Sequence, residues 1–144
     1  MVFATLAQQT WTILMFLVSG FALWRGRGPE RVIALANLAA WILTPLTYRT
    51  VLLDPQWGVF IVDAMFLGVL VWFAVTTDRN WLLFAAAFQL LAVVTHIAIA
   101  VDPGVRTLAY FRALVIWSYL VLGALAIGAR NAHRDRRAGL ADGT

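Results

Sequence analysis

Five apolar segments, each long enough to cross a lipid bilayer as a helix, follow one another along this sequence. The hydrocarbon core of a bilayer is about 30 Å thick, so a helix needs roughly 20 residues to span it. The segments run from Phe3 to Trp24, Val32 to Leu53, Trp57 to Val75, Trp81 to Val101 and Thr107 to Ala129. Because 62% of the residues are hydrophobic and only 12% are charged, the sequence predicts an all-α integral membrane protein and excludes a soluble domain.

Short polar turns separate these segments. Residues 25–31 contain three arginines, two glycines, one proline and Glu30. Asp-Pro pairs at 54–55 and 102–103 end the second and fourth segments, since proline disfavours helical geometry in the residue before it. The second segment contains Arg49, which lies close enough to the segment end to extend its charge to the headgroups. We therefore expect a five-helix transmembrane domain over 1–129 and a short basic cytoplasmic tail over 130–144.

The arginines predict the direction of insertion, because positively charged loops stay in the cytoplasm. Five crossings leave three arginines outside (Arg49, Arg106 and Arg112) and gather the other eight of the 11 basic residues on one side, which are Arg25, Arg27, Arg31, Arg79, Arg130, Arg134, Arg136 and Arg137. The predicted topology has the N-terminus outside and the C-terminus inside, as a multi-pass protein of the cell inner membrane.

A shift of 48 residues aligns two parts of the chain. It places Glu30 on Asp78, Thr47 on Thr95 and Asp54-Pro55 on Asp102-Pro103. The matches favour a parallel repeat of two helical hairpins, and similar turn chemistry in unrelated hairpins is the alternative explanation.

Polar side chains gather in the outer third of the predicted helices. Asp63, His96 and Arg112 each lie six residues from a helix end on that side, roughly 9 Å deep, and Tyr48 and Arg49 fall in the same layer. A charge in hydrocarbon costs about 2.5 to 3.5 kcal/mol, so it needs a partner or a watery pocket. We expect Asp63 to pair with Arg112 or Arg49, with His96 hydrogen-bonded nearby. This layer either fixes the helix register or binds a ligand or ion.

Small residues four apart allow two helices to approach closely. Three such pairs fall within the predicted spans and could serve either folding within the chain or docking onto another protein: Ala36 and Ala40, Ala64 and Gly68, and Ala124 and Gly128.

Several kinds of chemistry lack the residues that they need. The chain has no cysteine, and His96 is the only histidine predicted inside the membrane, which excludes a bis-histidine haem within one copy. His96 and Asp63 alone make a poor metal set, and no serine lies in a known nucleophile turn. We therefore predict no catalytic residue, no metal site, no cofactor and no nucleic-acid partner. A bound lipid or pigment is compatible with the helices.

In length, number of helices and tryptophan content the chain is similar to translocator proteins of the tryptophan-rich sensory type. It lacks the Asn-Pro-Pro and Trp-Val-Phe stretch of that family, and residues 25–31 have no counterpart of its first long loop. The resemblance therefore carries over no ligand and no site residue.

Two functions fit these observations. The first is a non-catalytic membrane subunit that packs on and stabilises a larger respiratory, photosynthetic or transport complex, with membrane lipids and other integral membrane subunits as partners. The second is a binding or transport protein whose outer polar cluster takes a small molecule or ion, with Asp63 accepting a proton, His96 relaying it and Arg112 holding an anionic group.

Overall fold

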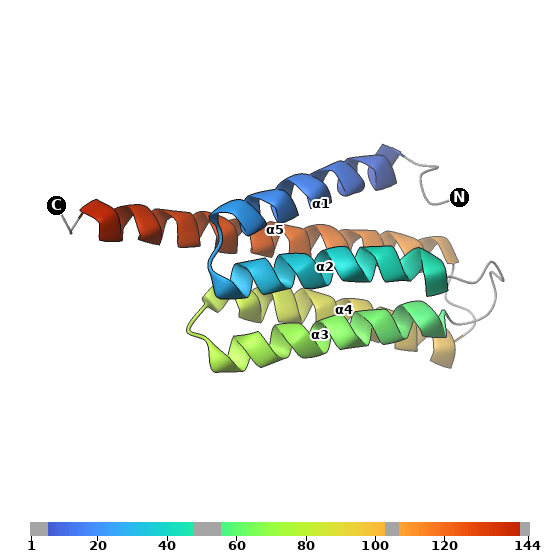
Figure 1. Cartoon of the computed structure of the whole chain (residues 1–144). Helices are drawn as coiled ribbons and strands as arrows, with labels where there is room; N and C mark the ends of the chain where they lie inside the picture. Colours follow the sequence, from blue (N-terminus) through green and yellow to red (C-terminus); the bar gives the residue numbers. More distant parts are fainter. Residues whose placement is uncertain (1–5, 48–55, 103–106, 142–144) are drawn as a thin grey trace.

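The computed structural model describes residues 6–47, 56–102 and 107–141, and these residues form five α-helices (Figure 1). The helices are α1 (Leu6–Arg25), α2 (Gly28–Thr47), α3 (Trp57–Thr76), α4 (Asn80–Val101) and α5 (Thr107–Ala141). For these described residues, the prediction of an all-helical fold with five helices is confirmed.

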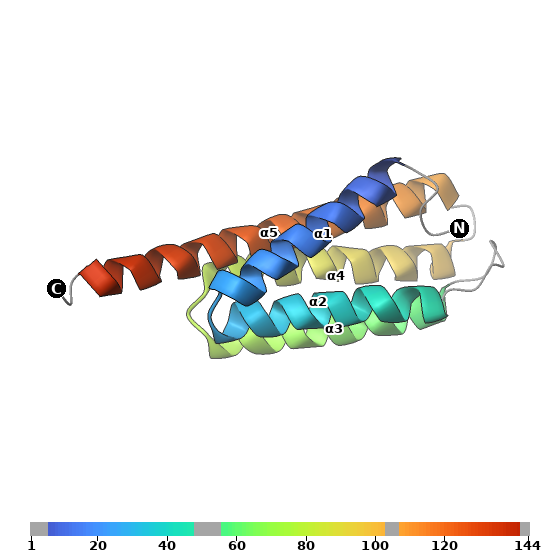
Figure 2. The ribbon, with the colours of Figure 1, turned by 45° about the horizontal axis from the view of Figure 1, so that its top comes forward.

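The helices form a closed ring of neighbours in chain order. Each helix packs against the next, α5 returns to pack against α1, and α2 also touches α5 across the ring. Figures 1 and 2 show α2, α3 and α4 running nearly parallel or antiparallel, while α1 crosses α5 at an angle. Short turns connect α1 to α2 and α3 to α4 at the same end of the bundle, which is also the end from which α5 projects. We call this the arginine-rich end.

The core of the bundle is apolar and contains many small residues. Ile33, Leu70, Leu82 and Leu125 are fully buried, and four alanines pack among them at 0% exposure, namely Ala22, Ala34, Ala85 and Ala129. Alanine lets helix backbones approach, so a narrow bundle can bury the larger side chains between them. The core cluster therefore contains few polar atoms that need a hydrogen-bond partner.

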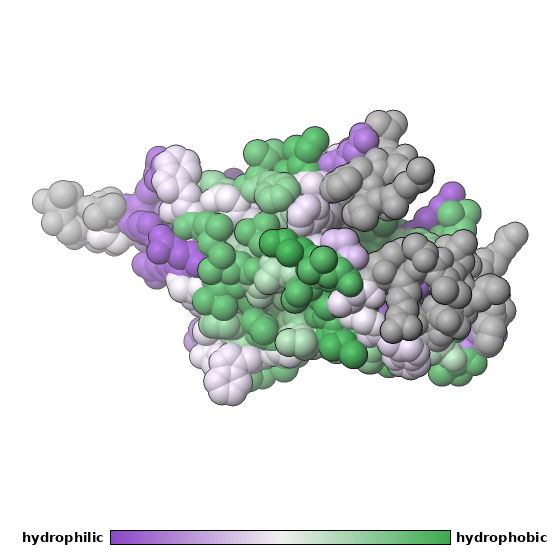
Figure 3. Space-filling model, turned by 45° about the vertical axis from the view of Figure 1, so that its right-hand side comes forward, coloured by the Kyte–Doolittle hydropathy of each residue, from purple (hydrophilic) through white to green (hydrophobic). Residues whose placement is uncertain are grey.

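The outside of the bundle is apolar as well. Every helix exposes large hydrophobic side chains, among them Leu17, Leu46, Trp72, Phe84 and Ile127. Figure 3 shows the resulting apolar band across the middle of one face, with hydrophilic residues concentrated toward the projecting end of α5. Helices α3, α4 and α5 are long and apolar enough to cross a membrane. The structure therefore indicates a membrane protein. Helices α1 and α2 are not among these three candidate spans, because they carry more polar residues.

One helix boundary differs from the sequence prediction in a way that matters for function. The fifth segment was predicted to end at Ala129, whereas α5 continues to Ala141. Alanine and arginine, which dominate 129–141, are strong helix formers, and no proline or aspartate-proline pair interrupts them. The described part of the basic tail is thus a helical extension of α5.

Candidate functional site

Four side chains from three helices meet in a hydrogen-bonded group near the end of the bundle opposite the arginine-rich end. His96 Nε2 lies 2.9 Å from Asp63 Oδ2, and His96 Nδ1 lies 2.8 Å from the Tyr110 hydroxyl. The Gln89 amide donates to Asp63 Oδ1 at 3.0 Å and to the Asp63 carbonyl oxygen at 3.2 Å. We call Asp63, Gln89, His96 and Tyr110 the Asp63 cluster.

Helix geometry explains why these residues meet. Gln89 and His96 are seven residues apart, which is two turns, so both point from the same face of α4 toward α3. Asp63 lies six residues after the start of α3 and Tyr110 lies in the first turn of α5, at the same end of the bundle. Gln89, His96 and Tyr110 are 3 to 5% exposed. The Phe60 ring meets the imidazole edge on, at 6.2 Å between centroids, and closes one side of the cluster.

The Asp63 cluster can hold a proton in more than one place without moving its heavy atoms. With a neutral imidazole, Nε2–H donates to the Asp63 carboxylate and Nδ1 accepts from the Tyr110 hydroxyl. With an imidazolium, Nδ1–H donates to the same hydroxyl oxygen, because a phenol can either donate or accept. The Asp63 side chain is 24% exposed, whereas that of His96 is 2% exposed. The carboxylate is therefore the member of the pair that is open to the surroundings.

The structure does not contain the predicted pairing of Asp63 with Arg112. No ion pair joins these two described residues, and the Arg112 side chain is exposed. Arg112 follows Tyr110 by two residues, and two residues turn a helix by roughly 200°. Since Tyr110 faces the core, Arg112 must face outward. The other two residues predicted for this layer, Tyr48 and Arg49, lie outside the described residues.

Two members of the Asp63 cluster, Gln89 and Tyr110, were missed by the sequence analysis. Gln89 could have been found from its spacing, because a polar residue two turns from an intramembrane histidine shares its helix face. Tyr110 has no such signal. It resembles any aromatic residue near a helix end, where aromatic rings are common at the headgroup level.

A double-mutant cycle tests the hydrogen bond between Asp63 and His96. We expect Asp63→Asn and His96→Gln to be non-additive, with a coupling of about 1 kcal/mol in the free energy of unfolding, since the two side chains share one bond. The same cycle with Arg112→Gln in place of His96→Gln should be additive. The measurement is detergent-solubilised unfolding followed by circular dichroism, and coupling to Arg112 but not to His96 would contradict the geometry.

A second group of polar side chains lies at the arginine-rich end and is centred on Glu30. Glu30 is 0% exposed. Its carboxylate accepts the backbone N–H of Arg27 at 3.0 Å, which caps the start of α2, and the indole N–H of Trp81 at 3.3 Å. Arg79 Nη1 lies 4.0 Å from Glu30 and 3.4 Å from Asp135 on the extension of α5. Glu30 thus ties the first turn of α2 to α4.

The predicted small-residue pairs fall into two environments. Ala124 and Gly128 are buried in α5, where a Cβ at Gly128 would lie 2.4 Å from the ring of Trp81. Gly68 is exposed, with open space where its Cβ would be, although Ala64 beside it is half-buried. Ala36 and Ala40 of α2 are half-buried. The α5 pair therefore lies where α4 and α5 are in close contact.

Within the described part of the chain, no group of three or more histidine, aspartate or glutamate side chains could hold a metal ion. Comparisons with protein-family models, curated proteins and solved structures gave no match. The geometry of the Asp63 cluster is therefore what bears on function.

Proposed function

We propose that this chain is an ion-binding or transport protein of the membrane whose ion is a proton, held by the Asp63 cluster. The observation that carries the proposal is the position of His96, a buried imidazole bonded on both ring nitrogens to groups that can themselves gain or lose a proton. Ionisable side chains inside a membrane are expensive and usually mark ion pathways or proton relays. The partly exposed carboxylate of Asp63 is the entry point, and Tyr110 on α5 is the next group that can exchange a proton with His96.

Nitrogen NMR of His96 tests this proposal. The chain has two histidines, so His133→Gln leaves His96 as the single labelled imidazole. We expect Asp63→Asn to change which ring nitrogen carries the proton, because it removes the carboxylate that accepts from Nε2 and supplies an amide that can donate to it. Identical nitrogen spectra of the parent and the Asp63→Asn variant would contradict the proposal.

A flux measurement separates binding from transport. In liposomes containing a pH-sensitive dye, we expect His96→Gln to abolish any proton flux that the wild-type protein supports, and Arg112→Gln to leave it unchanged.

The solvent accessibility of the cluster is a second test. A small water-soluble thiol reagent should label a cysteine placed at position 63. Full protection of cysteines at both 63 and 96 would argue for a purely structural cluster and favour the subunit function.

For the topology we infer five crossings of a cell inner membrane, with the N-terminus outside and the C-terminus in the cytoplasm. Helices α1 and α2 have 20 residues each, about 30 Å of helix, and pack in one ring with the three more apolar helices. The N-terminal end of α1 and the C-terminal end of α5 lie at opposite ends of the bundle (Figure 1). Reporter fusions at the two termini should be active in opposite compartments, and activity on the same side would overturn the topology.

The parallel repeat stays a prediction. Glu30 lies in the first turn of α2 and is buried, whereas Asp78, its counterpart in the shifted alignment, precedes α4 and is exposed. The two hairpins therefore place these acids in different environments.

The alternative function is an accessory subunit that packs against a larger membrane complex. The observation in its favour is the open face of α3, where Gly68 is exposed and nothing lies within 4 Å of a Cβ built on it. A helix of another protein could approach closely there. In purifications with mild detergent, Gly68→Ile should remove a partner that the wild-type chain retains, without lowering the melting temperature. A chain that purifies alone would count against this function.

A further inference from the structure

We propose that the interface between α1 and α2 binds a water molecule inside the bundle, held by the hydroxyl of Ser19 and the side-chain amide of Asn37. Ser19 Oγ and Asn37 Nδ2 are both shielded from the surroundings, and neither has a hydrogen-bond partner within the described part of the chain. Ser19 is 0% exposed. A buried polar atom without a partner is costly, and hydrocarbon around the bundle offers it none. This inference is independent of the proton-binding proposal.

The register of α1 and α2 places these two residues at one level. The helices are joined by a short turn and run antiparallel (Figure 1). The Phe16 ring of α1 meets the Trp41 ring of α2 edge on, at 5.4 Å between centroids. One helical turn closer to the connection, which is three residues along α1 and four residues back along α2, Ser19 lies opposite Asn37.

The surroundings of Ser19 and Asn37 are closely packed, so a ligand at this level must be small. Residues three or four positions away share their helix faces. On the side toward the connection and beyond Ser19 these neighbours are all 0% exposed, namely Met15, Ala22, Ile33 and Ala34. Seven residues closer to the connection, a Cβ at Gly26 would lie 2.7 Å from Glu30 Cβ, which shows that the two helices stay in contact there. A single water fits such a place better than a lipid or a larger organic molecule.

The Ser19 hydroxyl does not make the bond that other hydroxyls of this protein make. A serine or threonine in a helix can donate to the carbonyl oxygen four residues earlier. Several described side chains do so at 2.6 to 3.2 Å, namely Thr44, Thr47, Thr76, Thr77, Thr95 and Ser118. Ser19 makes no such bond to the Met15 carbonyl. Its hydroxyl therefore keeps its full capacity for a ligand between the helices.

Water has the hydrogen-bonding groups that this level needs. It can accept from the Asn37 amide and can either donate to Ser19 Oγ or accept from it. The level lies six residues, roughly 9 Å, from Arg25 at the end of α1, in the half of the bundle toward the arginine-rich end. Trp11 Nε1 is also buried without a partner among the described residues, but it lies eight residues, about 12 Å, from Ser19 and cannot share the same water.

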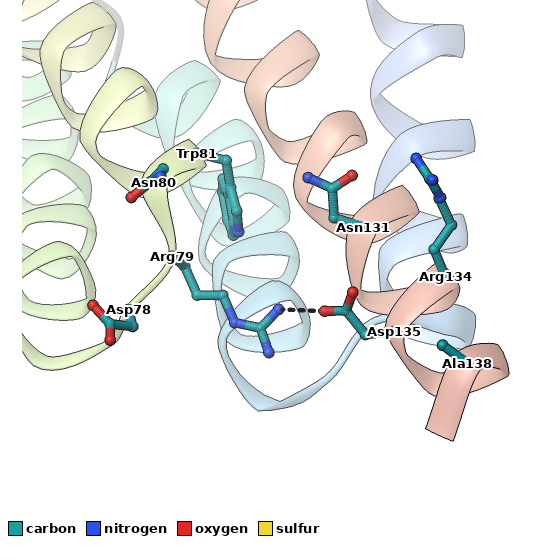
Figure 4. A pocket seen from close by; sticks show the side chains of 8 residues that line it. All are labelled: Asp78, Arg79, Asn80, Trp81, Asn131, Arg134, Asp135 and Ala138. Carbon is teal, nitrogen blue, oxygen red and sulfur yellow. Dashed lines mark hydrogen bonds and ion pairs between the residues drawn. The ribbon is translucent and has the colours of Figure 1, made fainter. Parts of the chain in front are cut away.

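The experiment measures magnetisation transfer from water to the side-chain amide of Asn37, by water-edited NMR of the full chain in lipid bilayers with nitrogen-labelled asparagine. The other two asparagines of the chain, Asn80 and Asn131, give the signal of amides in contact with bulk water. Both are exposed and line a surface pocket at the arginine-rich end, where Figure 4 shows the ion pair of Arg79 and Asp135. We expect the Asn37 amide to receive magnetisation from water as well. A complete lack of transfer to it would overturn the proposal.

Ser19→Ala and Ser118→Ala form a matched pair of variants. Each removes one hydroxyl from a helix of the bundle, but Ser118 Oγ donates to the Leu114 carbonyl of its own helix at 2.7 Å. We expect Ser19→Ala to abolish the transfer to Asn37, because the water keeps only one side-chain partner, and Ser118→Ala to leave it unchanged. An Asn37 signal that is the same in wild type and Ser19→Ala would mean that the hydroxyl bonds elsewhere, and the proposal would be wrong.

Thermal melts in detergent give a second measurement. Ser19→Ala and Asn37→Leu should each lower the melting temperature, and the double variant should lower it by less than the two shifts together, because both substitutions break the same water bridge. If the interface were dry, replacing an unpartnered amide by an apolar side chain of similar size would raise the melting temperature. A rise in Asn37→Leu, or fully additive shifts, would refute the bound water.

Discussion

Replacing Gly128 with alanine is expected to lower the free energy of unfolding by about 3 kcal/mol, the upper part of the range for an overpacked core. A Cβ at this position would lie 2.4 to 2.7 Å from three atoms of the Trp81 indole. The ring cannot easily move aside, because it is 6% exposed and its N–H donates to the buried Glu30 carboxylate. Helices α4 and α5 would have to separate. Thermal melts in detergent, followed by circular dichroism, measure the loss.

Gly123 is the matched control for this substitution. It lies on the same helix, is exposed, and has no atom within 4 Å of the position of a Cβ. Because alanine forms helices better than glycine, Gly123→Ala should leave stability unchanged or raise it by up to about 1 kcal/mol. If Gly128→Ala and Gly123→Ala melted at the same temperature, the close contact between α4 and α5 would be refuted.

Replacing Glu30 with alanine is the second change for which we expect a large effect. The part-buried Arg27 backbone N–H and the buried Trp81 indole N–H would both lose their acceptor, and a buried unsatisfied donor costs about 1 to 3 kcal/mol. We therefore expect a loss of roughly 3 kcal/mol in the free energy of unfolding. Glu30→Gln should cost less, because the amide oxygen can still accept one of the two bonds.

Asp78→Ala serves as the control for Glu30. It also removes one carboxylate from the arginine-rich end, but Asp78 is exposed and has no side-chain partner within the described residues. Its melting temperature should match that of the wild type. A loss as large as that of Glu30→Ala would mean that net charge, and not the buried hydrogen bonds, determines stability at this end.

The sequence was sufficient to predict how deep a side chain lies in the bundle. It was not sufficient to predict the direction in which that side chain points from its helix. Counting residues from the helix ends placed Asp63 and His96 at one level, and they do meet. The same count placed Arg112 at that level, yet it points away, because the direction of a side chain is fixed by packing around the whole ring of helices. An apolar outer surface adds to the difficulty. When a helix is hydrophobic on every side, its sequence does not show which side is inside.

The group around Glu30 was beyond the sequence analysis for a related reason. An acid in the first turn of a helix is normally an exposed residue that interacts with the helix dipole. Glu30 is buried because the indole of Trp81 turns inward against Gly128. The sequence indicated that both residues lie at one end of the bundle. Their contact depends on a glycine 47 positions farther along the chain than Trp81.

Helix α5 links the two ends of the molecule in a single rod. It has 35 residues, about 52 Å of helix, and contains no proline that would kink it. Tyr110 stands near one tip and Asp135 near the other. The helix that supplies Tyr110 to the Asp63 cluster therefore also supplies Asp135, whose carboxylate lies 3.4 Å from Arg79, so one unbroken helix joins the two polar groups.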